Sequence, residues 1–354
     1  MTPPNSVAAP HNSPDDLLER AAAWRAAQGG RSFPRELAEA IGTTEAELLA
    51  AECDGERVIR LRPDFEPLVH ALTDLGELKA ITRNAHAVIE KNGTFDPVEI
   101  FRHGRITMGN VLDAGIDLRL FLHQWGSAFA LRRPDSRYPV SIQLFDRFGG
   151  AVHKVFGRSE TAIAGFDALV DRFRHDDQAR TQSVEPRDAP AYAEQVDRDA
   201  LLADWAALED THQFFGLLRR HRVQRTTAMA LAEGTFTRAV GVDAVQTLLD
   251  RIRETEQTVM IFVGNTGCYQ IHIGPVQRTK VMGEWFNIFD PGFEFHLRAS
   301  GVDRAWVVRK PTAAGDLHSL EAYDADGQEI ALLHMKRADG EPEAEWWRAL
   351  LDAL

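Results

Sequence analysis

Cysteine is scarce in this chain of 354 residues, which contains only two, Cys53 and Cys268. They lie far apart in the sequence and form no CxxC motif. Disulfide scaffolds and thiolate zinc sites both need more cysteines at closer spacing, so the sequence argues against both classes. A reducing compartment, the cytoplasm, is the simpler expectation.

Long apolar runs are also missing. The most apolar short run, Thr258–Val263, falls far below the ~18 residues that a membrane-spanning helix needs. Residues 1–14 have neither a basic start nor a continuous apolar core, so we expect a disordered tail there and no signal peptide. The sequence therefore predicts no membrane insertion.

Positive charge is in deficit. Lysine and arginine total 40 against 53 aspartates and glutamates, which gives a net charge of -13. An acidic surface repels phosphate, so we expect no nucleic-acid partner, and any anionic ligand must meet a local basic cluster. The motifs GxGxxG after a strand, GxxxxGK[ST], GxSxG and HExxH are absent as well.

One charged, proline-containing segment divides the chain. Residues 174–200 contain few large apolar side chains, which predicts a linker between residues 15–173 and 201–354. The length points the same way, because one hydrophobic core rarely keeps growing beyond ~250–300 residues. We therefore expect two domains.

The two halves repeat each other. The segment Gly115–Leu120 matches Gly292–Leu297, Asn84 matches Asn265, and the offset between matched positions drifts only from 177 to 181. Each half begins with a helical region, expected at residues 15–51 and 201–254. It continues with short alternating strands and closes with an amphipathic helix, near residues 160–173 and 343–354. Helices grouped at the ends of a run of strands predict an α+β fold with antiparallel sheets, built as a tandem repeat.

Three segments of the second half are distinctive: residues 210–215 (DTHQFF), 261–268 (IFVGNTGC) and 306–312 (WVVRKPT). Together with the duplication, they make the chain resemble the HemS/ChuS/PhuS family of bacterial cytoplasmic haem-utilisation proteins. The resemblance runs from about residue 14 to the C-terminus. It implies two similar halves, each a large antiparallel sheet with helices packed on it. It also implies a haem cleft between the halves, with the iron ligated by a histidine of the second half.

His212, in the DTHQFF segment, is the axial histidine that the resemblance implies. A helix through it would place Leu208, Phe215 and Gly216 along its own face, leaving room for a porphyrin. The residues alone leave a second interpretation open, a hydrogen-bonded histidine near a helix N-terminus with Asp210 or Thr211 as the N-cap. Ligation through a neutral imidazole is ordinary haem chemistry.

The two propionates of haem need cations. The resemblance implies Arg225 and Lys310 as their partners, and an arginine fork matches a carboxylate geometrically. The neighbouring Arg219, Arg220 and Arg222 are expected on a solvated helix face. Phe262 is a candidate for packing on the porphyrin, with core packing as the alternative.

Arg119 is the expected contribution of the first half to the haem site. It alternates with Leu118 and Leu120, so it lies on the opposite sheet face from them. The resemblance implies an arginine near the iron, with alternatives that the sequence leaves open: Arg102 and Arg105. His86 and His103 could serve a secondary haem contact, or be ordinary surface histidines.

We therefore expect a haem-binding protein of haem uptake and iron acquisition. It would accept imported haem, with an importer ATPase complex or a downstream haem oxygenase as partner, and either pass the haem on or degrade it to release iron. In degradation Arg119 would be the catalytic residue that steers the distal oxygen. The alternative is a haem-independent binding or scaffold protein on the same duplicated fold. The sequence leaves the electron donor, the product and the oligomeric state open.

Overall fold

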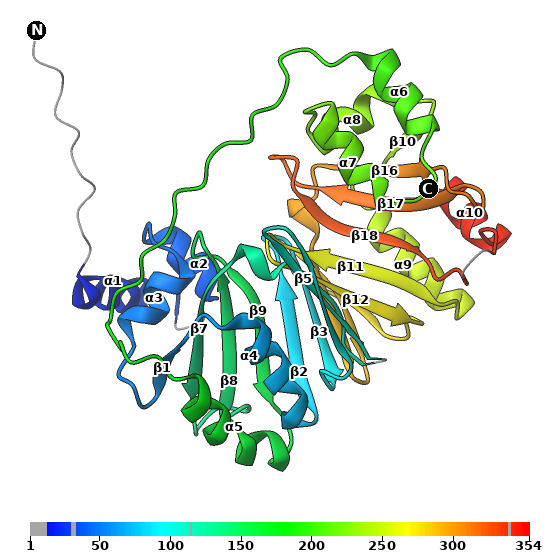
Figure 1. Ribbon diagram of the computed structural model, residues 1–354. Helices are drawn as coiled ribbons and strands as arrows, with labels where there is room; N and C mark the ends of the chain where they lie inside the picture. The colour runs from blue at the N-terminus through cyan, green and yellow to red at the C-terminus, as the bar shows by residue number, and fades with distance from the viewer. Residues whose placement is uncertain (1–12, 30–32, 114, 339–340) are drawn as a thin grey trace, which may run out of the picture.

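The computed structural model describes residues 13–29, 33–113, 115–338 and 341–354 (Figure 1). Most of the expected N-terminal tail, residues 1–12, lies outside the described residues. The first helix, α1, begins at Pro14, where the missing N–H of proline is not needed. The Ser13 side chain caps this helix by accepting a hydrogen bond from the backbone N–H of Asp16.

Each half contributes five α-helices and nine strands among its described residues. The elements of the first half are α1 (Pro14–Ala27), α2 (Pro34–Ala40), α3 (Glu45–Ala51), β1 (Val58–Leu61), α4 (Phe65–Ala71), η1 (Leu72–Leu75), β2 (Leu78–Arg83), β3 (Ala87–Gly93), β4 (Val98–His103), β5 (Ile106–Leu112), β6 (Asp117–Leu120), η2 (Leu122–Gln124), β7 (Trp125–Arg132), β8 (Val140–Asp146), β9 (Ala151–Gly157) and α5 (Glu160–Phe173). The elements of the second half are α6 (Arg198–Ala206), α7 (Gln213–Arg220), α8 (Arg225–Leu231), β10 (Thr237–Val240), α9 (Ala244–Thr255), β11 (Val259–Gly264), β12 (Cys268–Gly274), β13 (Thr279–Met282), β14 (Trp285–Asp290), β15 (Phe293–Arg298), η3 (Ala299–Gly301), β16 (Arg304–Lys310), β17 (Leu317–Tyr323), β18 (Glu329–Met335) and α10 (Glu345–Asp352).

The strands form two antiparallel sheets of nine strands each, which confirms the expected α+β fold. Sheet A has the order β1-β7-β8-β9-β2-β3-β15-β14-β13, and sheet B has the order β10-β16-β17-β18-β11-β12-β6-β5-β4. Each half therefore supplies six strands of one sheet and three strands of the other. The joints are the pairs β3–β15, where Ile89 lies opposite Phe295, and β6–β12, where Leu118 lies opposite Gln270.

The two sheets pack against each other through their central strands, β2 and β3 against β11 and β12. We call these packed surfaces the inner faces. Helices cover the rest of the inner faces: α4 and α5 lie on sheet A, and α9 and α10 lie on sheet B (Figure 1). The outer face of sheet B carries α6–α8 over β16 and β17, where Trp205 packs near Trp306 and Tyr323.

The matched asparagines of the repeat tie the halves together. The Asn84 side-chain amide donates to the carbonyl oxygens of Ile330 at 2.8 Å and Gly264 at 3.2 Å. The Asn265 amide donates in return to the carbonyl oxygens of Val152 at 2.8 Å and Arg83 at 3.0 Å. Each asparagine thus satisfies backbone acceptors of the opposite half at the centre of the molecule.

Residues 175–197 run from α5 to α6 without a helix or strand (Figure 1). The segment is nevertheless fixed to the first half. The Gln178 side chain accepts from the backbone N–H of Arg60 at 2.9 Å and donates to its carbonyl oxygen at 3.0 Å, as a neighbouring strand would. Further along, Arg187 lies 3.2 Å from the Asp146 carboxylate.

Most helical regions lie where the sequence predicts them. The closing helix α5 spans Glu160–Phe173, and α10 lies within residues 343–354. One exception is strand β10, which interrupts the expected helical region 201–254. The sequence did not reveal this strand because only Thr237 of its four residues is buried, so no alternation of apolar and polar residues marks it. Within the described residues, every helix is too short or too polar to cross a membrane.

Candidate functional site

A cavity of about 2120 Å³ opens between the outer face of sheet B and the end of the first half. Strands β11, β12 and β18 form its floor, with Arg119 of β6 beside them, and α7 and α8 form one wall. The α2–α3 loop, the β8–β9 turn and residues 185–192 line the opposite side. Pockets for drug-sized ligands measure ~300–1000 Å³, so this cavity accommodates a larger ligand. It is lined by all five residues singled out from the sequence: His212, Arg225, Phe262, Lys310 and Arg119.

His212 lies on the cavity wall at the N-cap position of α7. Its Nδ1 lies 2.6 Å from Oδ1 of Asp210, and its backbone N–H donates to the same oxygen at 2.7 Å. Because an ionised carboxylate only accepts hydrogen bonds, Nδ1 carries the proton and Nε2 keeps its lone pair. The side chain is 94% exposed. A carboxylate that holds Nδ1–H in this way is the common second partner of a metal-binding imidazole.

Asp210 is suited to this role by its charge. The backbone N–H of His212 is the main cause that lowers the pKa of Asp210, and the imidazole adds to the effect. The carboxylate therefore stays ionised at neutral pH and fixes the tautomer of the histidine.

The expected helix around His212 is wrong in part. Helix α6 ends at Ala206 and α7 begins at Gln213, so Leu208 lies in the intervening turn and is buried away from the cavity. The Asp210 carboxylate binds the backbone N–H of His212, which competes with helix formation at this point. Phe215, on α7, lines the cavity and is 70% exposed. Gly216 lines a separate hollow of about 700 Å³ and makes no room in the main cavity.

Arg225 and Lys310 meet at one buried carboxylate, that of Glu321. Arg225 Nη2 lies 2.7 Å from Glu321 Oε2, and Lys310 Nζ lies 2.5 Å from Glu321 Oε1. Ser319 donates to Oε1 at 2.9 Å, and the Tyr323 hydroxyl donates to Oε2. Burial alone would raise the pKa of Glu321, but the two cations outweigh it and hold this pKa well below its usual range. Glu321 is therefore an anion in the folded protein.

A second carboxylate balances the cluster. Arg225 Nη1 lies 3.1 Å from Glu329 Oε2, and the Tyr269 hydroxyl donates to Glu329 Oε1 at 3.1 Å. Two cations thus face two carboxylates, so the expected concentration of positive charge is largely cancelled within the cluster. In the described part of the chain, three other lining arginines make no ion pair: Arg219, Arg222 and Arg337.

Phe262 lies on the cavity side of β11 and is half-buried. Its ring stacks on His334 of β18, with centroids 5.0 Å apart and an angle of 17° between the planes. Burial lowers the pKa of His334 to about 4, so this imidazole is neutral at pH 7. The pair presents a flat, uncharged surface at the floor of the cavity.

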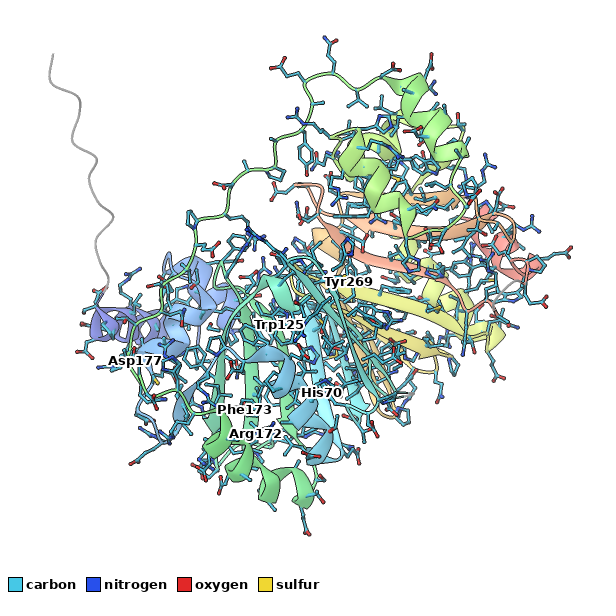
Figure 2. All side chains as sticks on the ribbon, viewed as in Figure 1. His70, Trp125, Arg172, Phe173, Asp177 and Tyr269 are labelled. Carbon is cyan, nitrogen blue, oxygen red and sulfur yellow. The ribbon has the colours of Figure 1, made fainter. Side chains whose placement is uncertain are left out.

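Arg119 extends from β6 onto the same outer face, as its alternation with the buried Leu118 and Leu120 predicts. It lies directly across from Tyr269 of β12 and forms an ion pair with Asp117. Tyr269, labelled in Figure 2, lies where the strands of the two halves meet within sheet B. The Arg119 guanidinium reaches the cavity because β6, a strand of the first half, belongs to sheet B.

Of the four alternative haem contacts that the sequence left open, only His86 lines the cavity. Arg102 pairs with Glu66, and neither it nor Arg105 or His103 lines the cavity. Sequence reasoning missed the buried partners Glu321, Glu329, Tyr269 and Tyr323. The alternation Ser319-Glu321-Tyr323 along one strand was a signal that these side chains share a face.

The family is settled by a comparison with protein-family models. Residues 42–173 and 222–354 each match the haemin-degrading HemS.ChuX domain. The chain belongs to the HemS/ChuX family. The two matches fall on the two halves of the internal repeat.

Relatives of this family align over nearly the whole chain. The hemin transport protein HmuS of Yersinia pestis is 36% identical over 325 residues, 91% of this chain and 92% of HmuS. The hemin transport protein HemS of Yersinia enterocolitica is 37% identical over 319 residues, 89% of this chain and 91% of HemS.

Two solved structures share the fold. Holo-PhuS, a heme-binding protein from Pseudomonas aeruginosa, superposes with a TM-score of 0.90 at 39% identity and covers 97% of this chain and 99% of PhuS. ChuS, a heme-degrading enzyme of Escherichia coli O157:H7, gives a TM-score of 0.86 at 33% identity and covers 96% of this chain and 99% of ChuS.

Proposed function

We propose that the chain binds haem in the cavity above sheet B, with Nε2 of His212 as the ligand to the iron. The observation that carries this is the convergence of His212, Phe262 and Arg119 on one cavity from α7, β11 and β6. These elements come from both halves. Relatives named for hemin transport, heme binding and heme degradation support haem as the ligand.

The residues present fit the group. His212 offers an exposed Nε2, and Asp210 holds the other ring nitrogen, Nδ1. The stacked rings of Phe262 and His334 offer a flat apolar surface. Arg225 and Lys310 remain our candidates for the propionates, although they pair with Glu321 and Glu329 in this structure. Arg219 and Arg222 add exposed cations without an ion pair at the cavity. Bound haem would supply an iron centre capable of redox chemistry.

Haem would be the cargo of this protein. An exposed axial imidazole on a cavity open to solvent suits a ligand that must be received and released, so transfer of haem is the function that the geometry supports best. We propose a cytoplasmic protein that receives haem from an importer ATPase complex or hands it to a downstream haem oxygenase. Residues 174–200 would connect the two repeats and close one side of the cavity.

A hemin titration tests the proposal. We expect a Soret band that saturates at one haem per chain, and a shifted or weakened band in His212→Ala. His103→Ala, which removes a histidine outside the cavity, should titrate as the wild type does. Unaltered binding in His212→Ala would overturn the assignment.

An assay of the haem-loaded protein with a reductant in air distinguishes degradation of haem from its transfer. Ring opening that persists with catalase, with release of iron, would make this chain an enzyme. In that case substitution of Arg119, whose guanidinium lies beside Tyr269, should slow the ring opening. Bleaching that catalase abolishes would come from free peroxide and would leave transfer as the function.

A further inference from the structure

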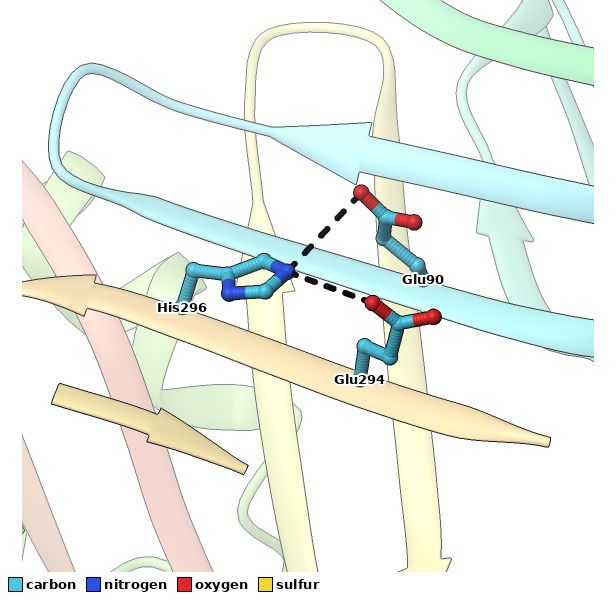
Figure 3. Close-up of side chains that lie close together, drawn as sticks. All are labelled: Glu90, Glu294 and His296. Carbon is cyan, nitrogen blue, oxygen red and sulfur yellow. Dashed lines mark ion pairs between the residues drawn. The ribbon is translucent and has the colours of Figure 1, made fainter. Parts of the chain in front are cut away.

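A group of three side chains outside the haem cavity converges on the outer face of sheet A (Figure 3). Glu90 lies on β3 and Glu294 lies directly opposite it on β15, with His296 two residues further along β15. Nε2 of His296 lies 3.9 Å from Glu90 Oε1 and 3.9 Å from Glu294 Oε2. The three atoms all lie within 4.8 Å of one another. The group sits at the joint where a strand of each half meets.

The tautomer of His296 is fixed from outside this group. The Asn287 side-chain amide donates to the carbonyl oxygens of Trp285 at 2.9 Å and Lys280 at 3.0 Å. Its Oδ1 is therefore the atom that lies 2.7 Å from His296 Nδ1, and Nδ1 must carry the proton. Nε2 thus directs a lone pair at two carboxylate oxygens.

One cation is already close, but it leaves the facing atoms unused. Lys79 Nζ lies 2.5 Å from Glu90 Oε2 and 3.1 Å from Glu294 Oε1. These are the other oxygens of the two carboxylates, not those that face His296. One ammonium against two carboxylates leaves a net negative charge beside the lone pair. A positive ion between the three facing atoms would satisfy all of them.

We propose that Glu90, Glu294 and His296 bind a divalent transition-metal ion, with zinc as its simplest representative. One imidazole nitrogen and two carboxylate oxygens are zinc ligands, and water completes a tetrahedral site. Ligand atoms around a tetrahedral zinc ion lie roughly 3.4 Å apart. The two distances of 3.9 Å from His296 Nε2 therefore need to shorten by about half an ångström. Asn287 would act as the second partner of the metal-binding histidine.

The internal repeat relates the proposed metal ligands to residues near the haem cavity. At the offset of 177, His296 corresponds to Arg119 and Glu294 corresponds to Asp117. The two pairs sit on three-strand units that the halves exchange, one in each sheet. The same position of the repeat thus faces the haem cavity in sheet B and carries a metal-ligand set in sheet A. None of the three proposed ligands lines the haem cavity.

The test is a zinc titration of the full chain without haem, in competition with a chromophoric chelator. We expect one zinc ion per wild-type chain and an affinity at least about tenfold lower in His296→Gln. Lys79→Met, which removes the competing ammonium, should bind zinc more tightly. His103→Gln, a control at an exposed histidine of β4, should match the wild type.

A second measurement separates loss of the site from loss of the fold. Zinc should raise the thermal midpoint of the wild type and leave that of His296→Gln unchanged. Hemin binding by His296→Gln should stay normal, so failure of the metal site is distinguishable from failure of the haem proposal. Equal zinc affinity in the wild type and His296→Gln would overturn the metal site.

Discussion

Nδ1 of His212 lies 2.6 Å from Oδ1 of Asp210, and this contact leaves Nε2 as the unprotonated nitrogen at the edge of a large cavity. The aspartate and the histidine lie in the turn before α7, so the pair is set by two residues of local chain. Its geometry is independent of the packing of the two sheets.

The first prediction concerns this contact. Asp210→Asn can still accept at Oδ1 but loses its negative charge, so the imidazole becomes a weaker ligand. We expect a hemin affinity about 10–100-fold lower, measured by Soret titration. Glu209→Gln removes a neighbouring exposed charge and serves as the control. Equal affinities in Asp210→Asn and the wild type would show that the carboxylate has no part in ligation.

The second prediction concerns Glu321, which holds both Lys310 and Arg225. Glu321→Gln leaves the buried Lys310 and the half-buried Arg225 with one fewer anion and should lower the free energy of unfolding by about 3–5 kcal/mol. The same change raises the net charge of the cluster, so the cations should prefer a propionate more strongly. The preference for hemin over its dimethyl ester should therefore grow in Glu321→Gln. An unchanged preference would show that Lys310 and Arg225 do not bind the propionates.

The third prediction concerns pH. Burial lowers the pKa of His153 to about 3 from its ordinary 6.5. Between these two values the unfolded chain binds a proton at this histidine and the folded chain does not. The contribution of His153 to the free energy of unfolding is fully present above pH 6.5 and is lost as the pH falls toward 3. The slope is about 1.4 kcal/mol per pH unit for one histidine. Between pH 7 and pH 5 the free energy of unfolding of the wild type should therefore fall by about 2 kcal/mol more than that of His153→Gln, measured by urea unfolding, and equal losses would contradict this assignment.

The fourth prediction follows from the exchange of strands. Each sheet needs three strands from the opposite half, so residues 1–190 and 191–354 expressed separately should fail to give folded proteins. Coexpression of the two fragments should restore a complex that binds hemin, since the cut lies in a segment without helix or strand. A separate second-half fragment with a cooperative unfolding transition would contradict this.

Much of this arrangement was predictable from the sequence. The matched asparagines Asn84 and Asn265 revealed the repeat, and the alternation around Arg119 gave its sheet face correctly. The choice of His212, Arg225 and Lys310 came from resemblance to a family, and the cavity brings them together. Composition and spacing alone left each of them with an ordinary structural explanation.

Other features depend on tertiary neighbours and could not be predicted. Alternation assigns a side chain to a face but does not say which sheet the strand joins, so the exchange of β4–β6 and β13–β15 was not foreseen. The pairing of Lys310 with Glu321 is a contact across adjacent strands, and no local pattern specifies it. The turn before α7 arose because Asp210 binds the backbone of His212 in place of a helical acceptor.

The most direct test of haem ligation by His212 is rescue of a cavity variant with free imidazole. His212→Gly should bind hemin weakly and with an altered Soret band, and millimolar imidazole should restore the wild-type band, because the exposed position leaves room for the small ligand. A wild-type spectrum in His212→Gly without imidazole would contradict ligation by this residue.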